Sequence, residues 1–354
     1  MVTLRDKFFG CIAASNIASA MGAAVEGMDY WEIERKHGYL DELLPYSHYN
    51  GRDRMAGTTE DGIERQRLLS TAYIEKERRI DAEDLRRIWL RDIEPENFGK
   101  QMEPCDEILY RLAEAGMPAR EIGSYSDYPG IVSFVRSCHP VGLVNAADPE
   151  TAAKDGMELG SLYQSGRAYG LQWGACYIAA LAQATRPEAT VQSVIDTALQ
   201  VVPKEPRALI NRGQKLAEEA GSYEELRDAF YDIYDGRGIK YGMSTSQELV
   251  PKGFALFKFM EGNPKKTILG AVNFGRDTDC TAAIAAGLSG ALRGSEEIPR
   301  EWIEQVDKAT KANEYTVSQR SLRETADGLQ KACKGKAERI KGVLAELKES
   351  GLDL

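Results

Sequence analysis

The sequence predicts an all-α protein, and three observations lead to this fold class. Alternation of apolar and polar residues is scarce along the 354 residues, and the run 130–135 is the best candidate for a strand. Capping side chains mark helix starts: Asp148 and Asn263 each precede a proline at the first helical position. Small residues recur at every fourth position in three segments, which clears one helix face for close packing.

The three small-residue segments predict the central helices. A glycine inside a helix costs about 1 kcal/mol relative to alanine, so its repeated use requires a packing reason. We therefore expect these helices to lie close together inside one compact domain. The segments contain, in order, Gly10, Ala14, Ala18 and Gly22; Gly166, Gly170 and Gly174; and Ala283, Gly287 and Ala291.

The last part of the chain has a different character. From Ser321 onward it is rich in lysine and glutamate, with leucines at roughly helical spacing. We predict a main domain over residues 1–320 and an amphipathic helical extension over residues 321–354. The extension is expected to pack on the domain with its charged face in water. Packing on a second subunit, and hence an oligomer, is the alternative.

Composition excludes several classes of function. The net charge of −10 argues against a nucleic-acid backbone as partner. We expect no membrane-spanning helix and find no signal-peptide pattern. The six cysteines lack Cys-x-x-Cys spacing, and three histidines are too few for a histidine-rich metal centre. Reduced thiols of this kind are typical of a cytoplasmic protein.

The most informative stretch is the acidic start of the third small-residue segment. Asp277 and Asp279 stand two positions apart before a run built largely of alanine and glycine. Two carboxylates this close repel each other unless a proton or a cation lies between them. A hard cation with oxygen ligands is one interpretation. A helix cap formed by Asp279 is the other.

Two further segments carry acidic side chains. Thr59, Glu60 and Asp61 stand just before a helical run at 63–77 and could form an oxygen-ligand cluster. When the segment is taken alone, helix capping is the better explanation. Glu26 follows the first small-residue segment. Burial there would raise its pKa, as a general acid or base requires; a solvated helix end is the alternative.

Taken in order, these three segments resemble the ADP-ribosylglycohydrolase family. The family's opening GxxxGDxxGxxxE motif is matched by residues 18–26, its Thr/Ser-Asp-Asp-Thr cluster by residues 59–62, and its GGDTDT motif by residues 275–280. Residues 136–142 are a softer match. The resemblance spans roughly residues 5 to 300.

The resemblance implies a fold, a cofactor and a site. The fold would be a single-domain orthogonal helical bundle, with a binuclear Mg²⁺ site at the bottom of an acidic cleft. The implied metal ligands are Thr59, Glu60, Asp61, Asp277 and Asp279. The candidates for activating water or moving protons are Glu26 and Asp61. The candidates for binding substrate are Ser19, Tyr241, Gly275 and Arg276. Two divalent cations and Arg276 would together neutralise the five carboxylates.

The sequence departs from the family's pattern around the metals. Ser19 and Gly62 replace an aspartate and a threonine, and Glu60 is one methylene longer than aspartate. Cys280 replaces a threonine ligand; because a thiol suits softer ions than Mg²⁺, we expect it to fill space. Arg276 replaces a glycine and could hold the aspartate pair or reach a substrate phosphate. These changes suggest altered substrate or metal use.

We therefore expect a metal-dependent hydrolase of a ribosidic bond in an ADP-ribosyl or related ribosyl substrate. One alternative is a hydrolase of a small N-riboside or nucleotide, which a narrow, deep pocket would support. Another is a family member that binds ADP-ribose or has a structural role without turnover. The polar loop at 238–251, with Tyr241, is expected to line the cleft. His139 is expected to be structural.

Overall fold

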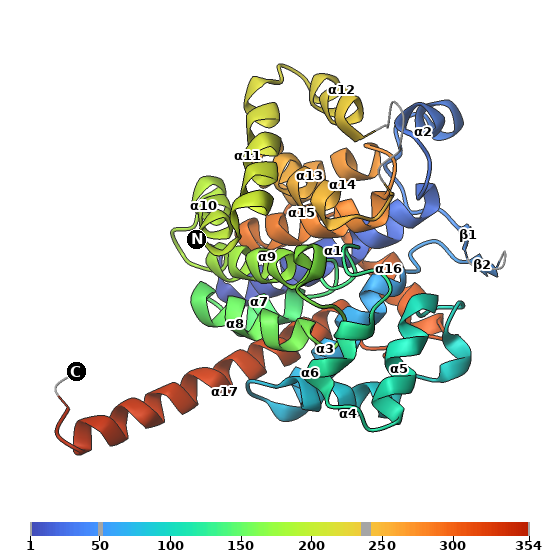
Figure 1. Cartoon of the computed structure of the whole chain (residues 1–354). Helices are drawn as coiled ribbons and strands as arrows, with labels where there is room; N and C mark the ends of the chain where they lie inside the picture. Colours follow the sequence, from blue (N-terminus) through green and yellow to red (C-terminus); the bar gives the residue numbers. More distant parts are fainter. Residues whose placement is uncertain (1, 49–51, 235–241, 353–354) are drawn as a thin grey trace.

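The computed structural model describes residues 2–48, 52–234 and 242–352, and it confirms the all-α fold (Figure 1). The α-helices are α1 Leu4–Gly22, α2 Tyr30–His37, α3 Asp61–Lys76, α4 Ala82–Asp92, α5 Glu107–Glu114, α6 Ala119–Ile122, α7 His139–Val144, α8 Pro149–Gly160, α9 Gly170–Ala184, α10 Val191–Val201, α11 Lys204–Glu219, α12 Tyr223–Tyr234, α13 Ser246–Phe259, α14 Pro264–Val272, α15 Thr278–Arg293, α16 Arg300–Ala312 and α17 Leu322–Glu349. Short 3₁₀ turns include η1 Ala23–Val25 and η3 Pro104–Asp106.

The strands lie elsewhere than predicted. In the part of the chain that the structure describes, β1 Tyr46–His48 and β2 Arg52–Arg54 form one antiparallel pair. The prediction of a strand at 130–135 is wrong: this run forms turns, with a single bridge between Ile131 and Thr245. Its apolar residues are buried in the core between helices, so their pattern reflects burial without strand pairing.

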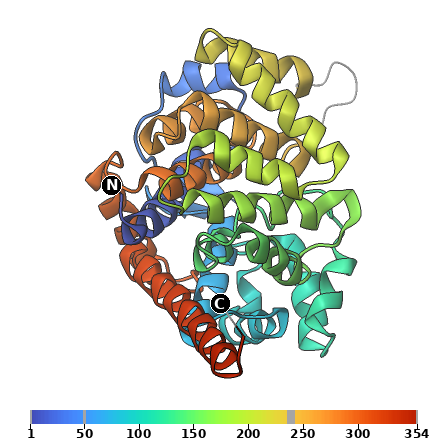
Figure 2. The ribbon, with the colours of Figure 1, turned by 90° about the vertical axis from the view of Figure 1, so that its left-hand side faces the viewer.

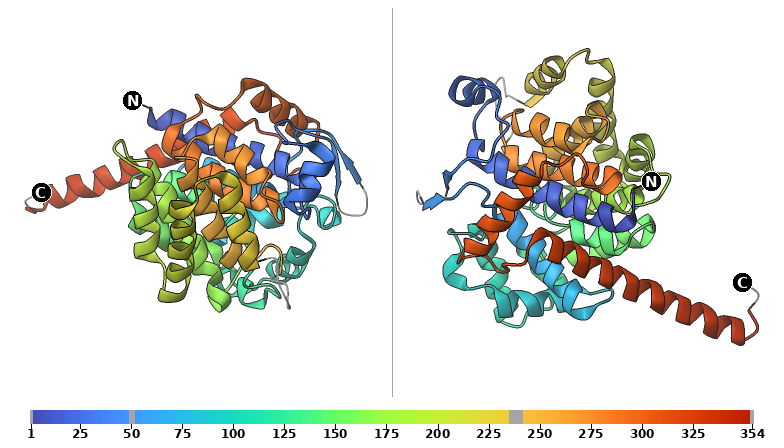
Figure 3. Two further views of the ribbon diagram at one scale, coloured as in Figure 1. Left: turned by 90° about the horizontal axis from the view of Figure 1, so that it is seen from above. Right: turned by 180° about the vertical axis from the view of Figure 1, so that it is seen from behind.

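Helices α1 and α15 form the centre of the molecule, and their small residues let the two backbones touch (Figures 1 and 3). A Cβ added to Gly290 would lie 2.1 Å from the carbonyl oxygen of Gly10. One added to Gly10 would lie 2.4 Å from the carbonyl carbon of Gly294. The predicted close packing of the first and third small-residue segments is therefore confirmed. The second segment is helical only from Gly170, where α9 begins.

A buried polar network joins α15 to three other helices. His139 of α7 lies 2.9 Å from both Gln66 Nε2 of α3 and the hydroxyl of Tyr177 in α9. Tyr177 donates to the Ile284 carbonyl at 2.8 Å, and Gly287 leaves the space that the imidazole fills. Burial lowers the pKa of His139 to about 4. The imidazole is therefore neutral and structural, as the sequence suggested.

Helix α17 packs on the body with its first half and extends away from it with its second half (Figures 1 and 3). Leu322, Ala326 and Leu329 are buried against the body, which includes α1, α3 and α7. The distal half exposes a line of apolar side chains: Ile340, Val343, Leu344 and Leu347. Helices α11 and α12 lie at the opposite end of the body (Figure 2). A contact of α17 with a second subunit, and a domain boundary at residue 320, remain predictions.

The described residues contain one stretch that is long and apolar enough, by length and composition alone, to cross a membrane. Leu4–Val25 has a mean hydropathy of 1.6 over an 18-residue window, and 94% of that window is buried inside the protein. This stretch is α1 and η1, the core helix and the turn that follows it. Its apolar character is explained by its position between other helices.

Candidate active site

The close packing of α1 on α15 brings three acidic segments together. A Cβ at Gly22 would lie 2.6 Å from the Cα of Asp279, and the Thr278 hydroxyl donates to the Gly22 carbonyl at 2.7 Å. The end of α1 is thereby fixed against the first turn of α15. The short turn η1 then carries the chain to Glu26, beside the acidic start of α15.

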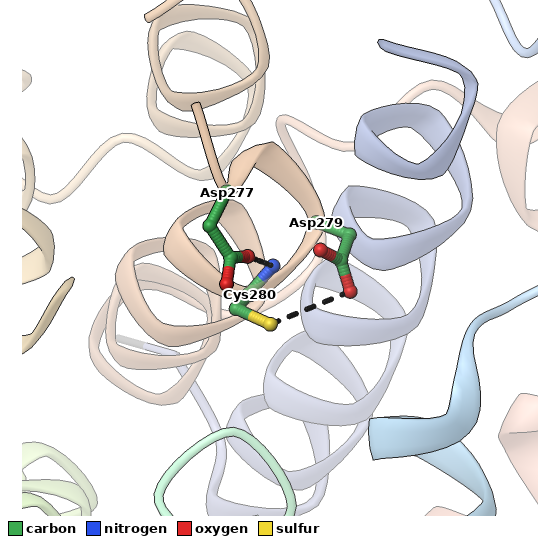
Figure 4. Close-up of side chains that lie close together, drawn as sticks. All are labelled: Asp277, Asp279 and Cys280. Atoms are coloured by element: carbon green, nitrogen blue, oxygen red, sulfur yellow. Dashed lines mark hydrogen bonds between the residues drawn. The ribbon is translucent and has the colours of Figure 1, made fainter. Parts of the chain in front are cut away.

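The first turn of α15 uses only part of its acidic side chains for capping. Asp277 is the N-cap residue, and its Oδ1 accepts a hydrogen bond from the Cys280 amide at 3.2 Å. Its Oδ2, and Oδ1 of Asp279, are buried without a hydrogen-bond partner among the described residues. Figure 4 shows these two carboxylates and the Cys280 thiol side by side. Capping and ligand binding are therefore compatible here, because different oxygens serve each.

The start of α3 shows that capping does not explain its acidic residues. Glu60 occupies the N-cap position, but its side chain makes no capping hydrogen bond. The buried Ser19 hydroxyl accepts a hydrogen bond from the Glu60 amide at 3.3 Å. Thr59 Oγ1 is also buried, with no hydrogen-bond partner in the described part of the chain. Thr59 therefore presents a buried oxygen that lacks a hydrogen-bond partner in the described part of the chain, and the side chain of Glu60 does not cap the helix.

Mutual repulsion dominates the electrostatics of the cluster. The pKa of Glu26 is raised well above its ordinary value by burial and by the charges of Asp277, Glu60 and Asp61. Burial, and the charges of Glu26 and Asp277, likewise raise the pKa of Asp279. Such a cluster is stabilised by protons or by cations.

The donor set fits a hard divalent cation. The ligand atoms of Asp277, Asp279 and Cys280 all lie within 4.8 Å of one another. Three buried oxygens, on Thr59, Asp277 and Asp279, lack hydrogen-bond partners among the described residues, and hard cations prefer oxygen ligands. The Cys280 thiol donates to Asp279 at 3.5 Å, so it is protonated there and suits the space-filling role better than that of a ligand.

The cation that the structure places at the cluster is Arg136, which precedes α7. Its guanidinium forms ion pairs with Asp61 at 2.5 Å and Asp279 at 3.7 Å, and it donates a hydrogen bond to Glu103 at 3.0 Å. It also donates to the Cys280 sulfur at 3.1 Å. The expectation that Arg276 neutralises these carboxylates is wrong. The Arg276 guanidinium forms a double ion pair with the buried Glu248, at 2.7 and 2.9 Å.

The other predicted substrate-binding residues differ in where they lie. Ser19 contacts the backbone at the start of α3, where its hydroxyl accepts the hydrogen bond from the Glu60 amide. Gly275 has φ +84° and packs so closely on the Asp29–Tyr30 backbone that an added Cβ would lie 2.6 Å from the Tyr30 nitrogen. Tyr241 lies outside the described residues. The polar loop ends earlier than expected, because α13 begins at Ser246.

Two adjoining cavities give access to the cluster. The inner one, of about 180 Å³, is lined by Glu26, Glu60, Asp61, Glu103 and Arg136, among others. The outer one, of about 760 Å³, is lined partly by Glu107, Arg111, Asp127 and Tyr128. Both include Glu103, Ile131 and Ser244, so the inner cavity opens toward the outer one at these residues.

Sequence reasoning missed Glu103. It follows α4 in an irregular segment and has no motif around it that points to the site. Burial and the charge of Asp61 raise the pKa of Glu103 to about 8, so its carboxyl holds a proton at neutral pH. The glutamate before Pro104 at the start of η3 was the only local signal, and it is equally typical of an ordinary helix start.

Comparison with known proteins agrees with this architecture. An uncharacterized protein of Archaeoglobus fulgidus is 25% identical over 305 residues, covering 85% of this chain and 92% of that protein. The uncharacterized protein YegU of Escherichia coli is 24% identical over 343 residues, covering 92% and 97%. A solved structure, an ADP-ribosylglycohydrolase-related protein complex, superposes with a TM-score of 0.64 at 15% identity, covering 94% of this chain and all of that chain.

A relative with a named activity matches over a shorter stretch. The ADP-ribosyl-[dinitrogen reductase] glycohydrolase of Rhodospirillum rubrum is 31% identical over 98 residues, which is 27% of this chain and 32% of that enzyme. Residues 1–339 match the sequence profile described as ADP-ribosylglycohydrolase. The match covers almost all of the predicted bundle and both acidic helix starts. The chain therefore belongs to the ADP-ribosylglycohydrolase family.

Proposed function

We propose that this protein is a metal-dependent hydrolase that cleaves the ribosidic bond of an ADP-ribosyl or related ribosyl group. One observation carries the proposal. Glu26, Glu60 and Asp61 line the inner cavity, and the buried aspartates of α15 lie beside Glu26. Carboxylates buried together destabilise a fold unless protons or cations offset their charge, and ionisable groups with such shifted pKa values are concentrated at functional sites. Family membership and the named activity of the Rhodospirillum rubrum relative support this class of reaction.

The side chains suit the chemistry of ribosidic hydrolysis. Positive charge develops at the anomeric carbon in the transition state, and nearby carboxylates stabilise it. Glu26 and Asp61, which both line the inner cavity, are the candidates for activating water or moving the proton. A divalent cation held among Thr59, Glu60, Asp61, Asp277 and Asp279 would supply positive charge toward ribose hydroxyls and water.

The test is release of a ribosyl product. The metal-stripped protein is incubated with an ADP-ribosylated protein, with and without Mg²⁺, and free ADP-ribose is measured by mass spectrometry. We expect release only with Mg²⁺, its loss in Glu26→Gln, and its retention in Glu338→Gln on the exposed part of α17. Absence of any cleaved riboside across ADP-ribosyl, nucleoside and nucleotide substrates would contradict the proposal and favour a binding or structural role.

A second candidate substrate class is a small N-riboside without phosphates. The described lining of the outer cavity includes the acidic residues Glu107 and Asp127 against one basic residue, Arg111, while Glu103 is protonated at neutral pH. Arg111 already pairs with Glu107 at 3.3 Å, and with Glu114. This part of the wall repels a diphosphate and accepts a neutral or cationic group. The ratio of kcat/KM for nucleosides to that for nucleotides tests it: a ratio above about ten favours the neutral riboside. A ratio below one contradicts it.

A further inference from the structure

The second half of α17 carries an apolar line that the rest of the protein does not cover (Figures 1 and 3). Ile340, Val343, Leu344 and Leu347 stand three or four positions apart, so they lie on one helix face. Each is between 41% and 47% exposed. Apolar side chains that gather on one surface mark a contact with another molecule. A helix that extends into water alone is also only marginally stable, and a packing partner would stabilise it.

A notch of about 580 Å³ lies at the root of this exposed half, where α17 leaves the body. Three side chains of the apolar line, Ile340, Val343 and Leu344, form part of its lining. The body contributes Arg78, from the connection between α3 and α4, and Thr151 of α8. A cavity of this volume has room for side chains of another helix. The apolar line therefore continues into a recess at the surface of the body.

The unpaired charges at the root and the tip of this exposed half are opposite in sign. At the root, the guanidinium groups of Arg78 and Arg339 line the notch, and neither has an ion-pair partner among the described residues. Near the tip, the carboxylates of Glu346 and Glu349 are exposed and likewise unpaired within the described ranges. A second copy placed antiparallel would bring the acidic tip of each helix to the basic root of the other.

The spacing of the charges agrees with the spacing of the apolar side chains. Arg339 and Glu346 lie on the same edge of the apolar line, seven positions apart. In an antiparallel pair with twofold symmetry the same edges meet, so Arg339 of each copy would face Glu346 of the other. The axis would pass midway between these residues, close to the middle of the apolar line. Lys341 and Lys348 follow the other edge, where their long stems let the ammonium groups reach water.

We propose that this protein dimerises through the second half of α17, with the two helices antiparallel and the tip of each in the notch at the root of the other. The occupant of the apolar face is thus a second copy of the chain. Parallel pairing would place root beside root and tip beside tip, where like charges repel. The proposal uses no residue of the acidic cluster, so it does not depend on the proposed hydrolysis.

The mass of the protein in solution tests the proposal. In sedimentation equilibrium of the full chain, we expect a mass that rises with concentration to twice 39.2 kDa. Leu344→Glu should remain a single chain, because it places a charge at the centre of the apolar contact. Ala345→Glu adds the same charge on the opposite face of the helix and should still dimerise. Both positions are exposed, so both variants should keep the wild-type circular dichroism spectrum.

Cysteine cross-linking tests the antiparallel orientation. A disulfide requires Cα atoms within about 7 Å of each other. Val343→Cys lies near the twofold axis and should link to its mate under mild oxidation, giving a dimer on a non-reducing gel. Leu347→Cys should not link, because its mate lies about two helical turns away. The wild type, which keeps the half-buried Cys333, is the control.

Charge reversal tests the register. Arg339→Glu should weaken association about tenfold, because it places like charges together twice across the axis. Arg339→Glu combined with Glu346→Arg should restore the wild-type association. Failure of the double variant to restore it would contradict the proposed register.

The remaining outcomes also decide the question. A wild type that stays at 39.2 kDa at every concentration would overturn the proposal and leave the apolar face to a different partner. A dimer that persists in Leu344→Glu would also overturn it, because another surface would then hold the two copies together. Cross-links at both cysteine positions would contradict the antiparallel arrangement.

Discussion

Helix α15 meets its surroundings in two different ways along its length. At Gly290 its backbone touches α1, and the polar groups around His139, which packs on Gly287, are paired with one another. In its first turn, buried oxygens of Asp277 and Asp279 have no hydrogen-bond partner in the described part of the chain. Both stretches are equally buried. Burial therefore does not distinguish the structural stretch of α15 from the candidate functional one. What distinguishes them is whether their buried polar groups have hydrogen-bond partners within the protein.

The difference also explains the choice of residue type. The core stretch of α15 uses glycine and alanine because α1 must approach it closely. The hydrogen-bond network around His139, which contacts this stretch, is uncharged. The first turn carries buried negative charge, and among the described residues Arg136 is the cationic side chain that pairs with it. A stretch optimised for packing should respond to substitution mainly in stability. A stretch held ready for a ligand should respond mainly in binding and activity.

The largest expected effect is at the contact of the two central helices. Gly290→Ala would place a methyl group 2.1 Å from the Gly10 carbonyl oxygen, and both backbones would have to separate. We expect a loss of about 3 kcal/mol in the free energy of unfolding, the upper range for overpacking. Urea denaturation measures it. Gly342→Ala on the exposed part of α17 is the control, since nothing lies within 4 Å, and should be neutral or stabilising by up to about 1 kcal/mol.

The second prediction concerns the first turn. Asp279→Asn should lower kcat/KM about 100-fold, equivalent to about 2.7 kcal/mol, because it removes a charged ligand oxygen. The metal-free variant should be at least as stable as the wild type, since one repelling charge is gone. Calorimetric melting and steady-state kinetics measure both. Asp196→Asn on α10 should change neither. A marked loss of stability in Asp279→Asn would place this turn with the core stretch.

The sequence predicted the packed stretch and the acidic segments of the site. It did not predict which other charged side chains lie among the carboxylates. The small-residue periodicity predicted the contact of α1 with α15, and the three motifs predicted which acidic segments belong together. Glu103 escaped because it lies in an irregular segment, whose side chain reaches the site through tertiary packing alone. Arg136 opens the softer match at 136–142, but nothing in the sequence showed that its side chain lies among the carboxylates. Arg276 misled because its position in a motif gave no sign of Glu248, which is 28 residues away in the chain.

The third prediction tests the satisfied network. His139→Leu removes the partner of Gln66 and Tyr177, leaving buried polar groups without hydrogen bonds. We expect a loss of about 2 kcal/mol in the free energy of unfolding, with unchanged Mn²⁺ affinity. His37→Leu, on the exposed end of α2, should cost less than about 0.5 kcal/mol. Weaker Mn²⁺ binding in a folded His139→Leu protein would show that the two stretches are coupled.

The smallest expected effect is on the pH dependence of stability. Groups around the two stretches should change the free energy of unfolding in opposite directions as pH rises. Burial beside Asp61 raises the pKa of Glu103 from 4.5 to about 8. Its ionisation therefore destabilises the metal-free fold, and stability is lost as pH rises toward 8. The pKa of His139 is lowered from 6.5 to about 4, so stability is lost as pH falls below 6.5. On each side of the profile, the free energy of unfolding should change by on the order of 1 kcal/mol per pH unit. The change is spread over a wide pH range because neighbouring groups titrate together.

Variants can assign each slope to its stretch. In urea denaturation of the metal-free protein, Glu103→Gln should flatten the profile on the alkaline side and leave the acid side unchanged. His139→Leu should do the reverse. Added Mg²⁺ should flatten only the alkaline side, because a cation favours the ionised carboxylates. If Mg²⁺ left the alkaline slope intact, the raised pKa of Glu103 would belong to ordinary burial and not to a cluster that awaits a cation.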